Sequence, residues 1–201
     1  MTLAAIIDYG AGNLFSISKA LEEAGLEVKI TVEPDLLMES DTLILPGVGN
    51  FGPATQRLRP LKDTIIDEVK SGKLFLGSCL GMQLLFKTSE ESPGEGLGLI
   101  NGKVKRFKEN VKVPHMGWNT IKRLRDSTLL DGIPDDSYFY FVHSYYPKPE
   151  NLKDVLAVTE YSQEFTSIVE RTSIYGTQFH PEKSGDMGAR LLENFASLVR
   201  K

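Results

Sequence analysis

The feature that most constrains the fold of this chain is a short stretch in which two glycines flank its only cysteine. The apolar run Leu74–Leu76 predicts a buried strand, and Met82–Phe86 predicts the start of a helix. Between them, positions 77–81 have the glycine-x-nucleophile-x-glycine spacing of a nucleophile elbow. The glycines allow a strand to turn abruptly into a helix, whose N-terminus favours a thiolate at Cys79.

A lone cysteine is more often a small buried hydrophobe than a nucleophile, so Cys79 needs a base to be catalytic. The histidines of the chain are His115, His143 and His180. His180 ends a β-type run, and Glu182 follows two residues later. A carboxylate so placed can hold the imidazole in the required tautomer and stabilise its charged form. The alternative is that His180 merely ends a strand beside a solvated Glu182, but the elbow cysteine favours the catalytic interpretation.

A glycine-rich turn after a second apolar strand predicts the third part of an acyl-transfer site. The strand is Thr42–Leu45, and the turn continues as Pro-Gly-Val-Gly at positions 46–49. A backbone N–H of Gly47 or Val48, together with that of Leu80, is expected to bind a developing oxyanion. Such turns are common, and this one gains weight because its strand precedes the elbow strand.

The order of apolar runs predicts an α/β fold with a doubly wound, mostly parallel sheet and flanking helices. Antiparallel strands are expected to extend the second half. The expected strands are Leu3–Ile7, Glu27–Thr31, Thr42–Leu45, Leu74–Leu76, Leu99–Phe107, Trp118–Arg123, Tyr138–Val142, Val155–Glu160, Ser167–Arg171 and Ile174–Phe179. The expected helices are Leu14–Ala24, Pro53–Arg57, Lys62–Lys70, Gly81–Thr88 and Gly188–Lys201.

Length and composition predict one ordinary globular domain over residues 1–201. The 23 basic and 27 acidic residues give a formal net charge of −4, which argues against nucleic acid as a partner. One cysteine cannot form an intrachain disulfide, which suits a reducing cytoplasm. No run approaches the ~18 apolar residues of a membrane span, and the N-terminus predicts a strand instead of a signal peptide.

Three motifs together resemble the class I (triad) glutamine amidotransferase family. They are Pro-Gly-Val-Gly at 46–49, Gly-Ser-Cys-Leu-Gly-Met-Gln at 77–83 and Gln-Phe-His-Pro-Glu at 178–182. Segments 9–13, 114–119, 138–145 and 180–184 also resemble one branch of that family, so the resemblance covers essentially the whole chain. In that branch the glutaminase supplies ammonia for imidazole glycerol phosphate synthesis in histidine biosynthesis.

The resemblance implies hydrolysis of glutamine to glutamate and ammonia through a thioester on Cys79. His180 is then the base and Glu182 its orienting carboxylate. Gln83, Ser144 and Tyr145 are expected to line the glutamine pocket. His143 is expected to be structural or pocket-lining, and His115 to support the segment that faces a partner. No cofactor or metal is implied.

The resemblance also implies a heterodimer with a cyclase subunit of the (β/α)₈-barrel type, which uses the ammonia. The residues expected at that interface are Tyr9, Asn13, Trp118, Tyr140 and Lys183. Three alternatives remain open at this stage. They are a glutaminase of another synthase (anthranilate, guanylate or pyridoxal phosphate), a free-standing γ-glutamyl cysteine hydrolase, and a non-catalytic subunit on the same scaffold.

Overall fold

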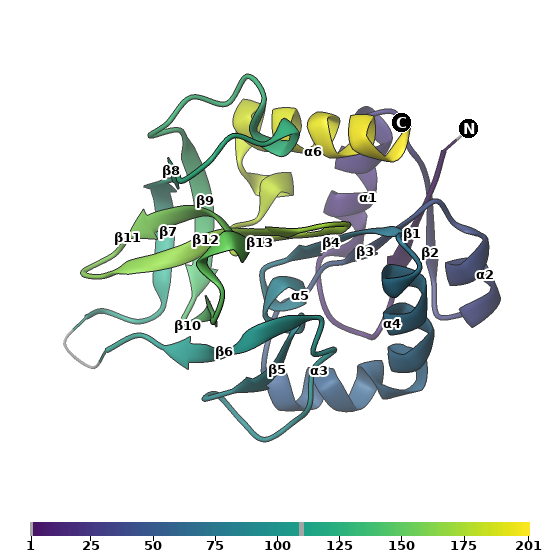
Figure 1. Cartoon of the computed structure of the whole chain (residues 1–201), viewed down its shortest axis with the longest axis horizontal. Helices are drawn as coiled ribbons and strands as arrows, with labels where there is room; N and C mark the ends of the chain where they lie inside the picture. Colours follow the sequence, from purple (N-terminus) through teal and green to yellow (C-terminus); the bar gives the residue numbers. More distant parts are fainter. Residues whose placement is uncertain (1, 109–110) are drawn as a thin grey trace.

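The structure is a computed structural model that describes residues 2–108 and 111–201 (Figure 1). The strands are β1 (Leu3–Ile7), β2 (Glu27–Thr31), β3 (Thr42–Leu45), β4 (Leu74–Ser78), β5 (Phe86–Ser89), β6 (Ile100–Arg106), β7 (His115–Thr120), β8 (Lys122–Arg123), β9 (Tyr138–His143), β10 (Tyr145–Pro149), β11 (Val155–Glu160), β12 (Glu164–Arg171) and β13 (Ile174–Thr177). The helices are α1 (Leu14–Glu23), α2 (Pro34–Glu39), α3 (Phe51–Leu58), α4 (Lys62–Lys70), α5 (Leu80–Gln83) and α6 (Gly185–Val199). Short 3₁₀ turns cover Arg59–Leu61, Thr128–Leu130, Leu152–Asp154 and Pro181–Lys183.

The largest sheet has the strand order β2-β1-β3-β4-β13-β12-β11-β8. The strands from β2 to β13 pair in parallel, and β12, β11 and β8 continue the sheet in antiparallel pairing. Helices α1 and α6 lie on one face of this sheet, and α3 and α4 lie on the other (Figure 1). The predicted α/β fold, with a mostly parallel sheet and added antiparallel strands, is therefore confirmed.

The core lies on both faces of the sheet because neighbouring residues of a strand point to opposite sides. In β1, Ala4 and Ile6 belong to the apolar cluster that includes α1 and α6. Ala5 and Ile7 belong to the cluster that includes α3 and α4. All four are fully buried, which explains why the strand is apolar throughout instead of alternating.

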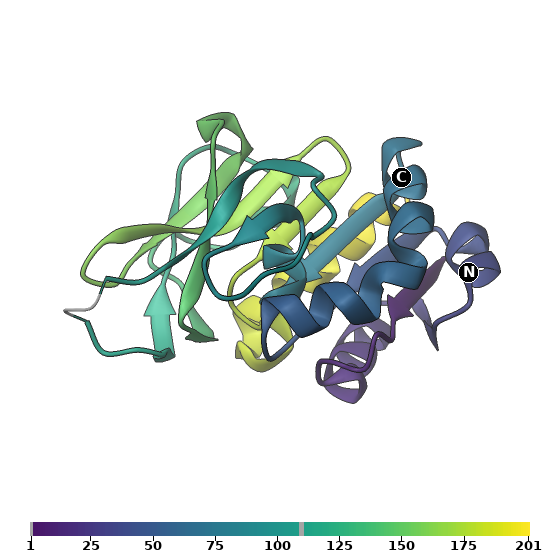
Figure 2. The same cartoon turned by 90° about the horizontal axis from the view of Figure 1, so that it is seen from below.

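Two smaller sheets complete the second half. β10 and β5 flank β6, and β7 pairs with β9. Figure 2 shows β7 and β9 at the end of the molecule away from both chain termini. No helix within residues 2–108 and 111–201 is long and apolar enough to cross a membrane.

The helix expected at Gly81–Thr88 is wrong beyond its first turn. Helix α5 ends at Gln83, and β5 begins at Phe86. The Leu97 N–H donates to the Leu84 carbonyl, and the Leu99 N–H donates to that of Leu85. These carbonyls therefore pair with a distant segment instead of continuing the helix.

Three further differences from expectation concern α2, β10 and the start of α6. Helix α2 was not predicted from its six residues, which begin with a proline at the first helical turn. Strand β10 was not predicted because it contains Pro147 and Pro149, and its place at the edge of its sheet tolerates them. Helix α6 begins at Gly185, ahead of the expected start at Gly188, and Leu191, Leu192 and Phe195 are buried while Leu198 and Val199 are only partly buried.

The topology brings three loops together at one edge of the sheet. Strands β3, β4 and β13 are neighbours, and all three run in parallel. The turn after Leu45, the elbow after Ser78 and the segment after Thr177 therefore leave from the same edge. Carboxyl ends of parallel strands are where open α/β sheets place their sites.

Candidate active site

Cys79 lies at the sharp turn between β4 and α5. Its φ of 54° and ψ of −108° fall in a region that residues with a side chain rarely adopt. A Cβ on Gly77 would lie 2.7 Å from the carbonyl carbon of Gly81, and one on Gly81 would collide with the Leu45 carbonyl oxygen. The Cys79 N–H donates a 2.7 Å hydrogen bond to the Thr177 carbonyl. The flanking glycines therefore permit the elbow, and β13 anchors it.

The Cys79 sulfur is almost buried and has two polar neighbours. Its residue is 6% exposed. The sulfur lies 3.9 Å from the carbonyl oxygen of Val142 and 3.8 Å from Nε2 of Gln178. Gln178 was not among the expected site residues, although it opens the segment that contains His180.

His180 and Glu182 form a buried pair. Nδ1 of His180 lies 2.9 Å from Oε1 of Glu182, and their side chains are 3% and 5% exposed. Among the residues that the structure describes, Nε2 of His180 has no hydrogen-bond partner. That nitrogen is therefore free to exchange a proton with a sulfur or a leaving group.

The electrostatic surroundings favour a charged His180. Burial opposes the charge, but the neighbouring Cys79 and Glu182 outweigh it and raise the pKa of His180 to about 10. At neutral pH the imidazole therefore holds a proton beside the sulfur. This is the arrangement that an activated cysteine nucleophile requires.

Strand β9 fixes the backbone of His180. The His180 N–H donates to the Tyr140 carbonyl at 3.0 Å. The Ser184 hydroxyl donates to the His180 carbonyl at 2.6 Å and accepts from the Tyr140 N–H at 3.0 Å. The position of the base is therefore coupled to the position of Tyr140.

The oxyanion turn is closed in this structure. The Leu80 N–H, expected as an oxyanion donor, donates instead to the Gly47 carbonyl oxygen at 3.3 Å. Because that oxygen and the Val48 N–H belong to one peptide plane, the plane presents its acceptor to Leu80. Of the expected donors, the Val48 and Leu80 N–H groups are thus brought together only if this peptide turns over.

A cavity of about 250 Å³ opens beside the sulfur. Its lining includes the three predicted pocket residues Gln83, Ser144 and Tyr145. It also includes Val48, Gly49, Cys79, Leu80, Glu91, Val142 and His143. The structure therefore gathers the predicted substrate residues around Cys79.

Glu91 is a cavity residue that sequence reasoning missed. It lies in a polar loop, and no sequence signal separates it from the nearby Glu90 and Glu95. Its Oε2 accepts a 2.7 Å hydrogen bond from the Phe51 N–H, and burial raises the pKa of its carboxyl. It supplies an acidic group to a cavity otherwise lined mostly by neutral residues.

Four of the five expected interface residues are at least partly exposed. Trp118 is 56% exposed, and its ring centroid lies 6.0 Å from that of Tyr140 on the neighbouring strand. Asn13, which caps α1, and Lys183 are exposed, and Tyr140 is partly exposed.

Tyr9 requires a correction. It is only 5% exposed, and its hydroxyl donates a 2.9 Å hydrogen bond to the Pro46 carbonyl. A side chain so buried offers no surface to another protein. It instead supports the oxyanion turn from within the core.

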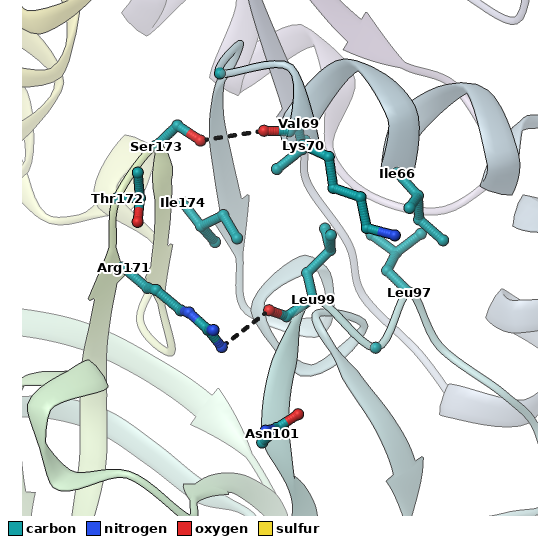
Figure 3. Close-up of a pocket in the computed structure, with 12 residues that line it drawn as sticks. Ile66, Val69, Lys70, Leu97, Leu99, Asn101, Arg171, Thr172, Ser173 and Ile174 are labelled. Carbon is teal, nitrogen blue, oxygen red and sulfur yellow. Dashed lines mark hydrogen bonds between the residues drawn. The ribbon is translucent and has the colours of Figure 1, made fainter.

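A larger cavity of about 430 Å³ lies at the opposite ends of β4 and β13 (Figure 3). Lys70 and Arg171 line it, and the Arg171 guanidinium donates to the Leu99 carbonyl at 3.5 Å. Its lining contains no cysteine, histidine or carboxylate. The predicted nucleophile, Cys79, lines the smaller cavity instead.

Known proteins match both the sequence and the fold. The family model for class-I glutamine amidotransferases matches residues 5–198. The imidazole glycerol phosphate synthase subunit HisH of Methanocaldococcus jannaschii is 51% identical over 195 residues, covering 96% of this chain and 98% of that protein. The subunit of the same name from Methanothermobacter thermautotrophicus is 50% identical over 197 residues, covering 98% of each. A solved structure described as a glutamine amidotransferase has a TM-score of 0.78 at 20% identity, covering 98% of this chain and 99% of its own.

The fold, the elbow and the sequence match define the class: the chain belongs to the class-I glutamine amidotransferase family. Within that class, its relatives of about 50% identity are HisH subunits of imidazole glycerol phosphate synthase. At this identity and coverage, the chain belongs to the same family as those subunits.

Proposed function

We propose that this chain is the glutaminase subunit of an imidazole glycerol phosphate synthase in histidine biosynthesis. It hydrolyses glutamine to glutamate and ammonia and passes the ammonia to a cyclase subunit. The observation that carries this proposal is the placement of the elbow residue Cys79 next to His180, whose imidazole lies 2.9 Å from the buried Glu182 carboxylate. The whole chain, residues 1–201, acts as one glutamine amidotransferase domain in this proposal.

The reaction begins when the Cys79 sulfur attacks the side-chain amide carbon of glutamine. The carbonyl oxygen becomes an oxyanion, and His180 gives its Nε2 proton to the departing nitrogen. The C–N bond breaks, which releases ammonia and leaves a γ-glutamyl thioester. Water then attacks the thioester while His180 removes its proton, and glutamate leaves as the sulfur is restored. Glu182 holds the imidazole in place and stabilises its charged form.

The cavity fits the substrate in charge and in the polar groups of its lining. Glutamine carries an ammonium group, and the Glu91 carboxylate is the acidic side chain in the lining. Gln83, Ser144 and Tyr145 provide polar groups for the rest of the molecule. We assign Glu91 to the ammonium, because a partly buried carboxylate binds a cation more strongly than an exposed one.

The partner in this proposal is a cyclase of the (β/α)₈-barrel type, joined as a heterodimer. Its binding surface is the outer face of β7 and β9, together with the exposed side chains of Asn13 and Lys183. Met116, Trp118 and Tyr138 are each more than half exposed on these strands. Exposed aromatic residues and methionine are typical of protein interfaces. A closed path between subunits also keeps ammonia from being protonated by water.

In this proposal the reaction takes place in the cytoplasm, where reducing conditions keep Cys79 a free thiol. The proposal is tested by measuring glutamate release with glutamine alone, with the cyclase added, and with the cyclase and its nucleotide substrate. Imidazole glycerol phosphate formation that depends on glutamine and on both subunits supports it. Glutamate release that ignores the cyclase favours a free-standing hydrolase, and release stimulated only by another synthase subunit favours a different pathway.

A further inference from the structure

Two histidines outside the triad form a buried pair at the cavity beside Cys79, which His143 lines. His115 and His143 are directly opposite each other in the β7–β9 pairing and are 3% and 6% exposed. Nδ1 of His115 lies 3.0 Å from Nε2 of His143. Neither ring takes part in the proposed chemistry, so their contact needs another explanation.

One carbonyl fixes the direction of the hydrogen bonds through both rings. Nδ1 of His143 lies 2.8 Å from the carbonyl oxygen of Tyr145, which can only accept. Nδ1 of His143 must therefore carry the hydrogen, and in a neutral ring Nε2 is then an acceptor. His115 consequently donates from Nδ1 and accepts at Nε2, where the Asn119 amide nitrogen lies 3.2 Å away.

Burial keeps both imidazole rings neutral, and this chain of hydrogen bonds requires neutral rings. Burial lowers the pKa of His115 to about 4. Burial also lowers the pKa of His143 to about 3, although its bond to Tyr145 acts in the opposite direction. At neutral pH each ring therefore has one donor and one acceptor, and the chain runs from Asn119 to Tyr145 without interruption.

The Tyr145 carbonyl also fixes a substrate residue. Gln83 Nε2 donates to it at 3.0 Å and to Oε1 of Gln178 at 3.2 Å. Both amide hydrogens of Gln83 are thereby used, so the group that Gln83 offers to the cavity is its oxygen. Glutamine brings N–H donors to this cavity, and an acceptor is what they require.

Aromatic packing holds the two rings in this geometry. Tyr161 stacks on His115 with ring centroids 4.2 Å apart. Phe107 and Phe165 contact His143 with centroid distances of 5.3 Å and 5.1 Å. The rings therefore have little freedom to rotate and break the chain.

We propose that Asn119, His115 and His143 are positioning residues for glutamine. Their one-directional chain fixes the Tyr145 carbonyl, which in turn orients Gln83 so that its side-chain oxygen faces the substrate. The inference rests on the proposed glutaminase function and adds three residues that touch neither glutamine's reacting amide nor the Cys79 sulfur in the mechanism above.

The test uses two substitutions of His143 in the complex with the cyclase and its nucleotide. In His143→Asn the amide nitrogen can replace Nδ1 and keep the bond to Tyr145. In His143→Gln the side chain reaches the position of Nε2 and loses that bond. We expect the KM for glutamine to rise about tenfold in His143→Gln and only about threefold in His143→Asn, which keeps the bond to Tyr145 but no longer accepts from His115. The kcat should change by less than about threefold in both.

Three controls separate positioning from damage to the fold. Tyr161→Phe leaves the stack on His115 and every link of the chain, so its KM should equal that of wild type. Cyclisation with ammonium salt should be unchanged in all variants, and so should the rate at which iodoacetamide alkylates Cys79. Equal KM values for His143→Gln and wild type, or equal losses in both His143 variants, would overturn the inference. Absence of glutaminase activity in wild type would instead reject the proposed function.

A second measurement does not depend on activity. Nitrogen-15 NMR of the wild-type imidazoles distinguishes a ring protonated at Nδ1 from one protonated at Nε2. Both His115 and His143 should be neutral Nδ1–H tautomers at pH 7. An Nε2–H tautomer at either ring would break the direction of the chain and reject the inference.

Discussion

The backbone N–H of Leu80 donates its hydrogen bond to the carbonyl oxygen of Gly47, 3.3 Å away. An oxyanion that formed at Cys79 would need that N–H, and it would be repelled by that oxygen. We therefore expect the isolated chain to be a poor glutaminase, and we expect activation to turn the Gly47–Val48 peptide so that its N–H replaces its oxygen.

We expect the cyclase and its nucleotide to raise kcat for glutamine by about 10²–10³-fold, which is the value of one oxyanion donor. Val48→Gly should raise kcat for glutamine in the isolated chain, because glycine lowers the cost of turning the peptide. The factor by which the cyclase and its nucleotide raise kcat should therefore be smaller in this variant. Val48 is 43% exposed, so little packing is lost. Steady-state kinetics with and without partner tests this, with Val48→Ala as the control. An unchanged stimulation in Val48→Gly would argue against the peptide rotation.

Cys79→Ala should reduce glutamine hydrolysis by at least about 10⁴-fold, because the chain has no other thiol. The complex should still form its product when ammonium salt is supplied at high pH. Residual glutaminase activity above about 1% in this variant would rule out Cys79 as the nucleophile.

His180→Asn should cost about as much activity as Cys79→Ala, because nucleophile and base act as one unit. Glu182→Gln should cost less, since its side chain can still bind Nδ1 at the same place. Glutamate release under saturating glutamine measures both. If His143→Asn were as damaging as Cys79→Ala while His180→Asn were mild, the base would be the wrong histidine.

The charged state of His180 should also appear in stability. Its pKa of about 10 in the folded protein lies above the unfolded value of about 6.5. The folded state therefore binds the extra proton between these values, and the stabilisation present below pH 6.5 is lost as the pH rises toward 10. Urea unfolding at pH 6.5, 8 and 9.5 should show this decline, and His180→Asn should flatten it. A decline of the same steepness in His180→Asn would assign it to other groups.

Mutation of Tyr9 should affect stability and not cyclase binding, whereas mutation of Trp118 should affect cyclase binding and not stability. Tyr9→Phe removes the buried bond to Pro46 and should lower the free energy of unfolding by about 1 kcal/mol. It should leave the affinity for the cyclase unchanged. Trp118→Ala should weaken that affinity and have little effect on unfolding, because Trp118 is 56% exposed. Calorimetric titration with the cyclase and denaturant unfolding measure the two effects.

Residue types and spacing were sufficient to predict the elbow, the His180–Glu182 pair and the alternating fold. The backbone lies so close to positions 77 and 81 that no side chain fits there. The resulting pair of glycines around the cysteine can be recognised in the sequence. The closed oxyanion turn was not predictable, because a peptide plane can face either way with the same residues.

Other features depend on distant partners. The His115–His143 chain requires a register between strands whose histidines are 28 positions apart. Tyr9 was expected at the surface because its motif suggested a partner contact, but packing against Pro46 buries it. Strand β5 replaces the later part of the expected helix, because the N–H groups of Leu97 and Leu99 bind the carbonyls of the two residues just before the strand. None of these contacts leaves a local signal.

The solitary thiol has a consequence for resistance to oxidation. An oxidant that reaches Cys79 would convert it to a sulfenic acid, and a second cysteine usually protects such a group by closing a disulfide. This chain has none, so only a thiol from outside can restore the nucleophile. If none arrives, further oxidation is irreversible. Within this chain, protection of the thiol from oxidation therefore rests on the almost buried position of Cys79.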